Sequence, residues 1–338
     1  MGATVDPVTP RAADSPASGE PGRLGDALAR AFDAHRPLLW GLGYRLTGNA
    51  ADADDVVQET FVRALARPPA RPGDPWRPWL VKVALNVGRD LLRRRRRRGY
   101  EGPWLPSPVE TTEGDPPSFE PGTDGAGPAA RYDLLESVSL AFLLALEALT
   151  PAQRAALLLR DVFDYSVRET AAALAMSEAN VKTTHLRARR AMAAYDRDRR
   201  PSSHDGFACT RRALEGFLDC LMRGDAAGLE ALLARDVRMV SDGGGEFVSA
   251  RRPVLGREKV VRFYASLRAK AAALALPLPR IELRPLNGLP AAVLRFPPLP
   301  RPYAPVVVLQ ARLDGEGRIA ELLNVSATAK LTALPPPR

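Results

Sequence analysis

The segment from Tyr165 to Arg190 carries side chains whose types and spacing suit the reading of base pairs. Asparagine can pair with adenine through two hydrogen bonds, and lysine or arginine can pair with guanine in the same way. Arg189 and Arg190 are better suited to phosphate, which adds affinity without sequence preference. The candidates for contact with a DNA major groove and its flanking phosphates are therefore Ser177, Glu178, Asn180, Lys182, Thr183, Arg187 and Arg190.

These side chains act together only if two helices present them. An apolar stripe at helical spacing predicts a short helix over 166–174, and Ser177 is a good N-cap for a second helix that runs to about Tyr195. The inner face of the second helix is expected to hold Val181, Leu186 and Ala188. The pattern predicts a helix-turn-helix, whose second helix enters the major groove. The alternative is a plain helical hairpin with an exposed basic face.

A second set of polar side chains suits contact with a protein. Asp52, Asp55 and Glu59 recur at spacings of three and four, so they share one face of a helix predicted over 52–65, with Gln58 between them. The buried stripe of this helix is expected to contain Val56, Val57, Phe61 and Leu65. The acidic face either docks on a basic surface or keeps the helix solvated.

A third set lies along a helix predicted from about Trp79 through Leu92 into the arginine run 93–98. An unpaired base can stack on an aromatic ring while a basic groove holds the strand. Trp79 is expected in the core, whereas Trp76 fits either the core or a nucleic-acid contact. The candidates for contact with melted DNA are Trp76, Asn86, Arg89, Asp90 and Arg93.

Composition limits the class of protein. The 338 residues carry a net charge of +9, and the clustered arginines favour a polyanionic partner. Cys209 and Cys220 are eleven residues apart in one predicted helix, about 16 Å, so they cannot form a disulfide within it. Without a secretory signal or an apolar run of membrane-spanning length, the sequence predicts a cytoplasmic protein that does not contact a membrane.

Composition shifts divide the chain. We expect a disordered N-terminus (1–22), a helical module (23–99), a Pro- and Gly-rich flexible linker (100–130), a second helical module (131–200), an α+β domain (205–327) and a tail (328–338). In the α+β domain, helices at about 206–222, 225–233 and 257–272 accompany strands at 237–241, 281–286, 291–296, 305–313 and 318–325. Helices first and strands last predict a curved antiparallel sheet.

The segments His35–Gly48 and Asp52–Phe61, with Asp55-Val56-Val57-Gln58-Glu59 the most specific part, resemble region two of extracytoplasmic-function sigma factors. The resemblance implies two all-α sigma modules, the second with the helix-turn-helix. It implies that Asp52, Asp55, Gln58 and Glu59 dock on core RNA polymerase. It also implies that the helix after Trp76 melts and reads the minus-ten element, and that the helix-turn-helix reads the minus-thirty-five element. The implied partners are core polymerase and promoter DNA.

The last third resembles the sigma subgroup with a fused SnoaL-like cone domain, through 102–108, 240–246 and 251–257. In that subgroup the domain contacts the sigma modules and tunes activity in cis, which marks Asp242, Gly243, Gly244, Gly245 and Glu246 as a regulatory motif. The motif of this subgroup usually ends in lysine, where this chain has Glu246. Its tail usually reads Asn-Pro-Asp-Lys-Leu, where this chain has Asn324-Val325-Ser326 and, later, Lys330-Leu331.

Other functions fit the sequence less well. SnoaL-like enzymes commonly use an Asp/His pair, but the three histidines, His35, His185 and His204, all precede the third domain. We therefore expect no enzyme, cofactor or metal site, although a small-molecule pocket in the cone stays possible. A free helix-turn-helix regulator with a ligand-binding domain is the alternative, and it would have no need of the helices at 52–65 and 76–98.

Overall fold

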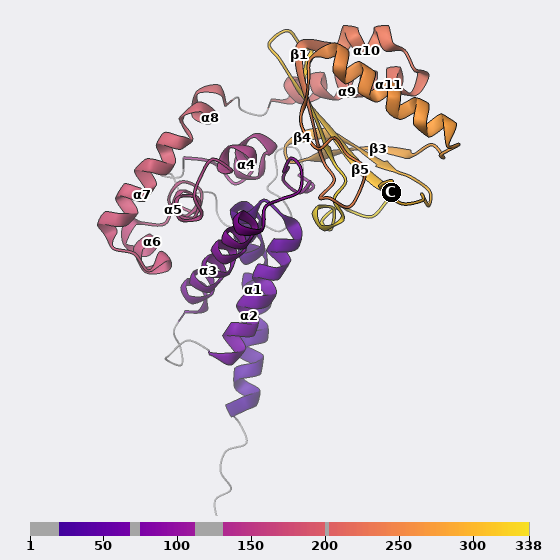
Figure 1. The fold of residues 1–338 in the computed structure, drawn as a ribbon. Helices are drawn as coiled ribbons and strands as arrows, with labels where there is room; N and C mark the ends of the chain where they lie inside the picture. The colour runs from indigo at the N-terminus through magenta and orange to yellow at the C-terminus, as the bar shows by residue number, and fades with distance from the viewer. Residues whose placement is uncertain (1–19, 68–74, 112–130, 200–202, 338) are drawn as a thin grey trace, which may run out of the picture.

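The computed structural model describes residues 20–67, 75–111, 131–199 and 203–337. The expected disordered N-terminus up to residue 19 and the linker residues 112–130 lie outside these ranges. None of the helices within them is both long and apolar enough to span a bilayer. Figure 1 shows two groups of helices and a sheet domain that meet at the middle of the molecule.

The N-terminal module is a bundle of three helices: α1 (Glu20–Thr47), α2 (Ala50–Ala66) and α3 (Trp76–Arg98). Asn49 caps α2, because its side chain accepts a hydrogen bond from the Ala51 amide. The helices approach closely at Gly88, where an added Cβ would lie 2.5 Å from a methyl of Leu46. Small residues at this crossing let the apolar stripes of all three helices meet.

The middle module contains η1 (Glu136–Val138), α4 (Leu140–Leu146), α5 (Pro151–Asp161), α6 (Val167–Leu174), α7 (Glu178–Ala191) and α8 (Ala193–Asp198). Local sequence explains its boundaries. A capping box of Thr150 and Gln153 starts α5, and a second box of Ser166 and Glu169 starts α6. Ser177 caps α7, as predicted, so α6 and α7 form the expected helix-turn-helix.

The two helical modules share one hydrophobic core. A single cluster of buried side chains contains Leu39 and Leu85 from the N-terminal module and Leu146 and Leu158 from the middle module. Helix α3 packs directly against α5 and α6. The modules therefore do not behave as two separate bodies in this arrangement, because opening them would expose apolar surface.

The C-terminal domain places α9 (His204–Arg223), α10 (Ala226–Leu232) and α11 (Arg257–Ala273) on one side of a twisted sheet (Figure 1). The strands are β1 (Leu233–Asp242), β2 (Val254–Leu255), β3 (Arg280–Leu286), β4 (Leu289–Arg295), β5 (Val306–Leu313) and β6 (Ile319–Val325), in the order β2-β1-β6-β5-β4-β3. The α+β prediction is confirmed. The prediction of a purely antiparallel sheet is wrong, because β6 pairs with β1 in parallel.

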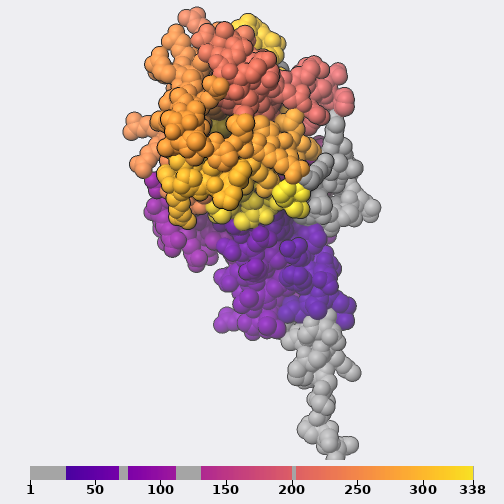
Figure 2. Space-filling view, turned by 90° about the vertical axis from the view of Figure 1, so that its right-hand side faces the viewer, coloured from indigo at the N-terminus to yellow at the C-terminus, as the bar shows by residue number. Residues whose placement is uncertain are grey.

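The opposite face of the sheet covers the helical modules. Space-filling Figure 2 shows the orange and yellow C-terminal domain resting directly on the indigo and purple N-terminal module. The short helix η2 (Thr328–Lys330), in the segment predicted as a tail, packs against α2. Residues 105–109 are buried, so the prediction of a flexible linker is wrong for this stretch. Its apolar side chains and prolines fill the seam between the domains.

Candidate nucleic-acid and polymerase interfaces

Helix α7 exposes the face predicted to read DNA. All seven predicted side chains are exposed, and α7 packs on α5 through Val181 and Ala188. Ser177 also caps the helix by accepting a hydrogen bond from the Asn180 amide at 3.2 Å. Figure 1 places α6 and α7 far from the C-terminal domain, so that domain leaves this face open.

A buried carboxylate fixes the direction of α7. Asp161, at the end of α5, accepts hydrogen bonds from His185 at 2.9 Å and from Arg189 at 2.7 Å and 3.1 Å. Burial acts to raise the pKa of Asp161, but the hydrogen bonds from His185 and Arg189 outweigh it and hold the pKa below its usual value. Arg189, expected to bind phosphate, is thus held by an internal partner.

Leu186 lies on the outer face of α7 rather than in the core. Its exposed fraction is 50%, whereas the sequence predicted an inward position with Val181 and Ala188. At 100° per residue, Leu186 follows Thr183 and precedes Arg190 on one face. An apolar side chain among polar ones can contact the methyl group of thymine. The rotation of 100° per residue along the helix was the signal in the sequence that could have placed Leu186 on the exposed face.

Helix α2 presents a mixed face to solvent. Asp55 and Gln58 are exposed, while Glu59 is partly covered and bonded to Arg63 at 2.7 Å. Val62 and Leu65 lie on the same face with exposed fractions of 62% and 63%. The prediction that Leu65 belongs to the core is wrong. The acidic residues and these two apolar side chains form one continuous surface suited to a protein partner.

Asp52 differs from the other acidic residues of α2. It lies near the start of the helix, on the part of the N-terminal module that η2 covers. Burial raises the pKa of Asp52 to about 6, and the neighbouring Asp55 adds to this effect, while the cations Arg95 and Lys330 oppose it. Asp52 is therefore not freely available in this arrangement.

Helix α3 brings four of the five predicted melting residues onto one face. Asn86, Arg89 and Asp90 are partly buried, and exposed Arg93 bonds to Asp90 at 2.9 Å. Trp76 lies ten residues before Asn86, about 15 Å along the helix, so the structure does not bring it to the others. Trp76 and Trp79 are both partly buried and pack against the shared core.

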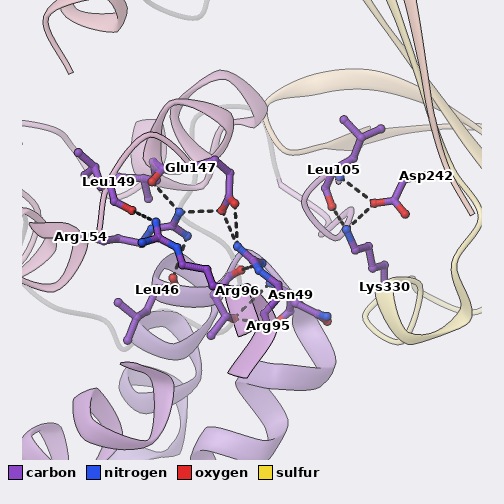
Figure 3. A network of polar contacts seen from close by, with 12 residues as sticks. Leu46, Asn49, Arg95, Arg96, Leu105, Glu147, Leu149, Arg154, Asp242 and Lys330 are labelled. Carbon is purple, nitrogen blue, oxygen red and sulfur yellow. Dashed lines mark hydrogen bonds and ion pairs between the residues drawn. The ribbon is translucent and has the colours of Figure 1, made fainter. Parts of the chain in front are cut away.

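The arginine run is divided between solvent and the interior. Arg95 donates to both carboxylate oxygens of Glu147, at 2.9 Å and 2.7 Å, and its Cζ lies 4.4 Å from the centroid of Trp104. Arg96 donates to the carbonyl oxygen of Leu149. Figure 3 shows these contacts from α3 to the end of α4. Arg95 and Arg96 therefore have partners within the protein, and only the rest of the run fits the solvated, polyanion-binding segment that its composition suggests.

Arg154 completes this polar centre from the middle module. It is 2% exposed and donates to the carbonyl oxygen of Leu46 at 2.9 Å, to that of Leu146 at 2.6 Å and to Glu147 at 2.7 Å. Burial lowers the pKa of Arg154, and the Glu147 carboxylate opposes that shift. The arginines of both modules thus converge on one carboxylate (Figure 3).

The turn between β3 and β4 joins all parts of the molecule. Asn287 donates from Nδ2 to the hydroxyl of Tyr44 at 2.7 Å and to the carbonyl oxygen of Val138 at 2.9 Å. Its Oδ1 accepts from the amide of Val109 at 3.2 Å. The Tyr44 hydroxyl donates to the carbonyl oxygen of Ser107 at 2.6 Å. One side chain therefore contacts the N-terminal module, the linker and the middle module. The sequence analysis did not identify it, although Asn-Gly is a typical hairpin turn.

The predicted regulatory motif forms a buried contact at the same seam. Asp242 is 1% exposed and accepts from the hydroxyl of Tyr100 at 2.6 Å, the amide of Leu105 at 2.7 Å and Lys330 at 2.5 Å. Burial lowers the pKa of Lys330 to about 8, and Asp242 opposes this shift. Figure 3 shows Lys330 between Leu105 and Asp242.

The glycines of the motif shape the turn rather than the contact. Gly244 and Gly245 have φ of 59° and 75°, and a Cβ on Gly244 would lie 2.8 Å from Ala327. Glu246, which ends the motif, is exposed. The residue that meets Asp242 is therefore Lys330 from the tail.

Comparison with known families identifies both helical modules. The model of sigma-70 region 2 matches residues 31–98, and the model of sigma-70 region 4 matches residues 139–192. These matches fall on α1–α3 and on the helices around the helix-turn-helix.

Individual relatives agree with these matches. The chain is 36% identical over 240 residues to the ECF RNA polymerase sigma factor SigJ of Mycobacterium tuberculosis, covering 70% of this chain and 72% of the relative. It is 34% identical to SigG of the same organism, covering 58% of this chain and 56% of that protein. The crystal structure of M. tuberculosis SigJ superposes with a TM-score of 0.63 at 28% identity, covering 91% of this chain and 99% of that one.

Proposed function

Because the chain belongs to the extracytoplasmic-function sigma factors of RNA polymerase, we propose that its C-terminal domain controls initiation in cis by holding the two sigma modules closed. Sigma factors bind core RNA polymerase and promoter DNA. The observation that carries the proposal is the shared core of the two modules together with Asn287, which bonds to both of them. The Asp242–Lys330 pair holds the linker beside them at Tyr100 and Leu105.

The closed arrangement does not fit a promoter. Packed helices lie about 8–10 Å apart, and α6 lies between α3 and α7. Helices α3 and α7 therefore approach to within about 20 Å of each other. Elements centred near minus ten and minus thirty-five are about 85 Å apart along straight duplex DNA. The modules must separate before both elements are read, and every contact that holds them together opposes initiation.

We assign three surfaces to the open form. The minus-thirty-five element contacts α7 through its seven exposed candidates, joined by Leu186. The minus-ten element contacts the face of α3 that carries Asn86, Arg89 and Arg93, with Asp90 orienting Arg93. Core polymerase contacts α2 through Asp55, Gln58 and Glu59, with the exposed Val62 and Leu65. Asp52 joins this surface only after η2 has left α2, which couples polymerase binding to release of the C-terminal domain.

The same proposal gives the C-terminal domain a contact role and no catalytic one. Its interior, on the helix side of the sheet, is filled by Phe217, Met239 and Tyr264. Among the residues that the structure describes, no three of His, Cys, Asp and Glu are placed to hold a metal ion. A free helix-turn-helix regulator is the alternative function. The accessible face of α2, which lies within the region-2 match, favours the sigma function.

In vitro transcription tests the proposal directly. Purified core polymerase is supplied with the full chain, with a chain that ends at residue 201, or with the full-length variant Asn324→Ala. We expect promoter-specific transcripts that need the protein, and more of them from the truncated chain. Among the residues that the structure describes, the side chain of Asn324 bonds within its own domain, so its variant should resemble the full chain. Equal transcription by the full and truncated chains would contradict cis control. Duplex binding without polymerase-dependent transcripts would instead favour the free regulator.

A further inference from the structure

A cavity of about 520 Å³ lies at the seam between the C-terminal domain and the sigma modules. Residues 102–105 of the linker form one wall, Leu144 of α4 forms another, and strands β1 and β6 form the floor. Sites for small organic molecules occupy about 300–1,000 Å³ and favour domain interfaces. The cavity thus has the size and the position of a ligand site.

The cavity is on the outside of the cone, not within it. Arg238 and Val240 of β1 pair with Glu321 and Leu323 of β6, and these four side chains line the cavity. Successive residues of a strand point to opposite faces. Their neighbours, such as Met239, belong to the filled core under the helices. A small-molecule pocket inside the cone stays a prediction from sequence, whereas this cavity lies on the other face of the sheet.

The lining combines an apolar floor with an excess of positive charge. Leu105, Val240 and Leu323 belong to one buried apolar cluster, against which Leu144 packs. Three arginines line the cavity: Arg238, Arg251 and Arg252. The single carboxylate among the lining residues, Glu321, already bonds to Arg312 at 2.7 Å and lies 3.6 Å from Arg238.

Two of the cations are open to a new partner. Arg251 lies 3.5 Å from Glu101, and both side chains are largely exposed, so this pair is loosely held. In the part of the chain that the structure describes, no carboxylate lies within ion-pair distance of Arg252. The Trp104 indole N–H, also at the cavity, is buried without an acceptor among the described residues.

We propose that this cavity binds a small organic anion with an apolar body and one carboxylate. The apolar body packs against Pro103, Trp104 and Leu144, which line the cavity and are partly exposed. The carboxylate is bound by Arg252 with Arg251. Arginine suits this role because its planar fork matches a carboxylate through two parallel hydrogen bonds. Three arginines line the cavity, and its one carboxylate is already bonded. An anion therefore fits the cavity better than a neutral or cationic molecule does.

Such a ligand would bind the closed form of the protein. The linker, α4 and the sheet all contribute walls, so the cavity is complete only while these parts are together. A molecule that binds one of two arrangements shifts the balance toward that arrangement. Binding itself does not depend on the proposed cis control, whereas the effect on initiation rests on it.

Binding to the full chain is measured by isothermal titration with decanoate, naphthalene-2-carboxylate and the neutral decanol. Quenching of tryptophan fluorescence is followed in parallel, and the variant Trp104→Phe identifies the signal from the cavity. We expect saturable binding of at least one carboxylate and at least about tenfold weaker binding of decanol, because the ion pair is lost. The flexible and planar carboxylates distinguish an acyl ligand from an aromatic one.

Arg252→Gln should weaken carboxylate binding about tenfold and leave decanol unchanged. Arg211→Gln is the matched control: it removes an exposed arginine of the same domain whose partner, Glu215, also lies outside the cavity, and it should bind the carboxylates as the unmodified chain does. No saturable binding of either carboxylate, equal affinity for decanol, or an unchanged affinity in Arg252→Gln would each overturn the proposal. Transcription is not part of this test, so its outcome is independent of cis control.

Discussion

Replacing Asn287 with glycine should loosen the junction at which the C-terminal domain meets both sigma modules. The residue is 1% exposed, and its side chain bonds to Tyr44, Val138 and Val109. Its φ is 51°, a left-handed conformation that glycine adopts without strain. The substitution therefore removes the three side-chain hydrogen bonds and leaves the backbone of the turn in place.

The size of the effect follows from the groups left without partners. The amide of Val109 and the carbonyl oxygen of Val138 lose their bond, whereas the Tyr44 hydroxyl still donates to Ser107. A buried polar group without a partner costs about 1–3 kcal/mol, and water entering the vacated volume favours the lower half of that range. The closed arrangement should lose about 2–4 kcal/mol, which shifts the closed-to-open equilibrium roughly 30- to 700-fold.

Amide hydrogen exchange on the full chain measures this shift. Peptides from 103–111 and 136–146 should exchange faster in Asn287→Gly, by the factor above if the seam opens locally. Asn324→Ala is the control, because Asn324 bonds to Ser241 and Tyr264 inside the C-terminal domain. It should speed exchange there and leave the peptide 136–146 unchanged. If Asn287→Gly changed exchange at the seam by less than about threefold, these hydrogen bonds would not be what holds the modules together.

Three further predictions concern single sites. The pKa of Asp52 is raised from 3.8 to about 6, so the protein loses stability as pH rises through this window. Asp52→Asn should therefore raise the free energy of unfolding by about 1–3 kcal/mol at pH 7.5 and not at pH 3.5, in urea titrations. Ala175 has a left-handed φ of 51°, so Ala175→Gly should stabilise the protein by about 0.5–1 kcal/mol in thermal unfolding. Ala172→Gly, inside α6, should destabilise it by about 1 kcal/mol. Stability changes of the same sign in both variants would contradict backbone strain at Ala175. Arg187→Ala should lower transcription from promoters with an intact minus-thirty-five element about tenfold, while Arg211→Ala, on α9, should not; matching losses would remove Arg187 from the DNA surface.

Local patterns predicted most of the elements because short-range forces set them. The N-cap at Ser177 begins its helix where the sequence indicated, since its side-chain acceptor satisfies an amide that no helical carbonyl can reach. The capping box at Thr150 begins α5 in the same way. Cys209 and Cys220 are free in one helix, as expected from their spacing. Apart from the two-residue strand β2, which was not predicted, the order of helices and strands in the last domain also followed from periodicity.

Positions that depend on neighbours in space were predicted less well. Leu65 and Leu186 fit an apolar stripe in sequence, yet both are at least half exposed, because each helix has only one packed face and they lie outside it. Composition predicted a flexible linker where residues 105–109 are buried, since prolines are also suited to an extended segment between two surfaces. The parallel pairing of β1 with β6 joins strands about 80 residues apart, which no hairpin signal reports.

The sequence by itself determined two helical modules, the second with a helix-turn-helix, and an added α+β domain, because helix and strand signals are local properties of the chain. Its resemblance to extracytoplasmic-function sigma factors, rather than spacing alone, indicated the family. The sequence also predicted candidate contact residues on α2 and α7, although it placed the exposed Leu65 and Leu186 in the core. Only the tertiary structure decided which polar side chains from distant segments contact one another. Folding brings Lys330 onto Asp242, Glu147 between Arg95 and Arg154, and Asn287 against Tyr44. Such contacts form when burial of apolar surface presses distant segments together, and the polar groups trapped there must then find partners.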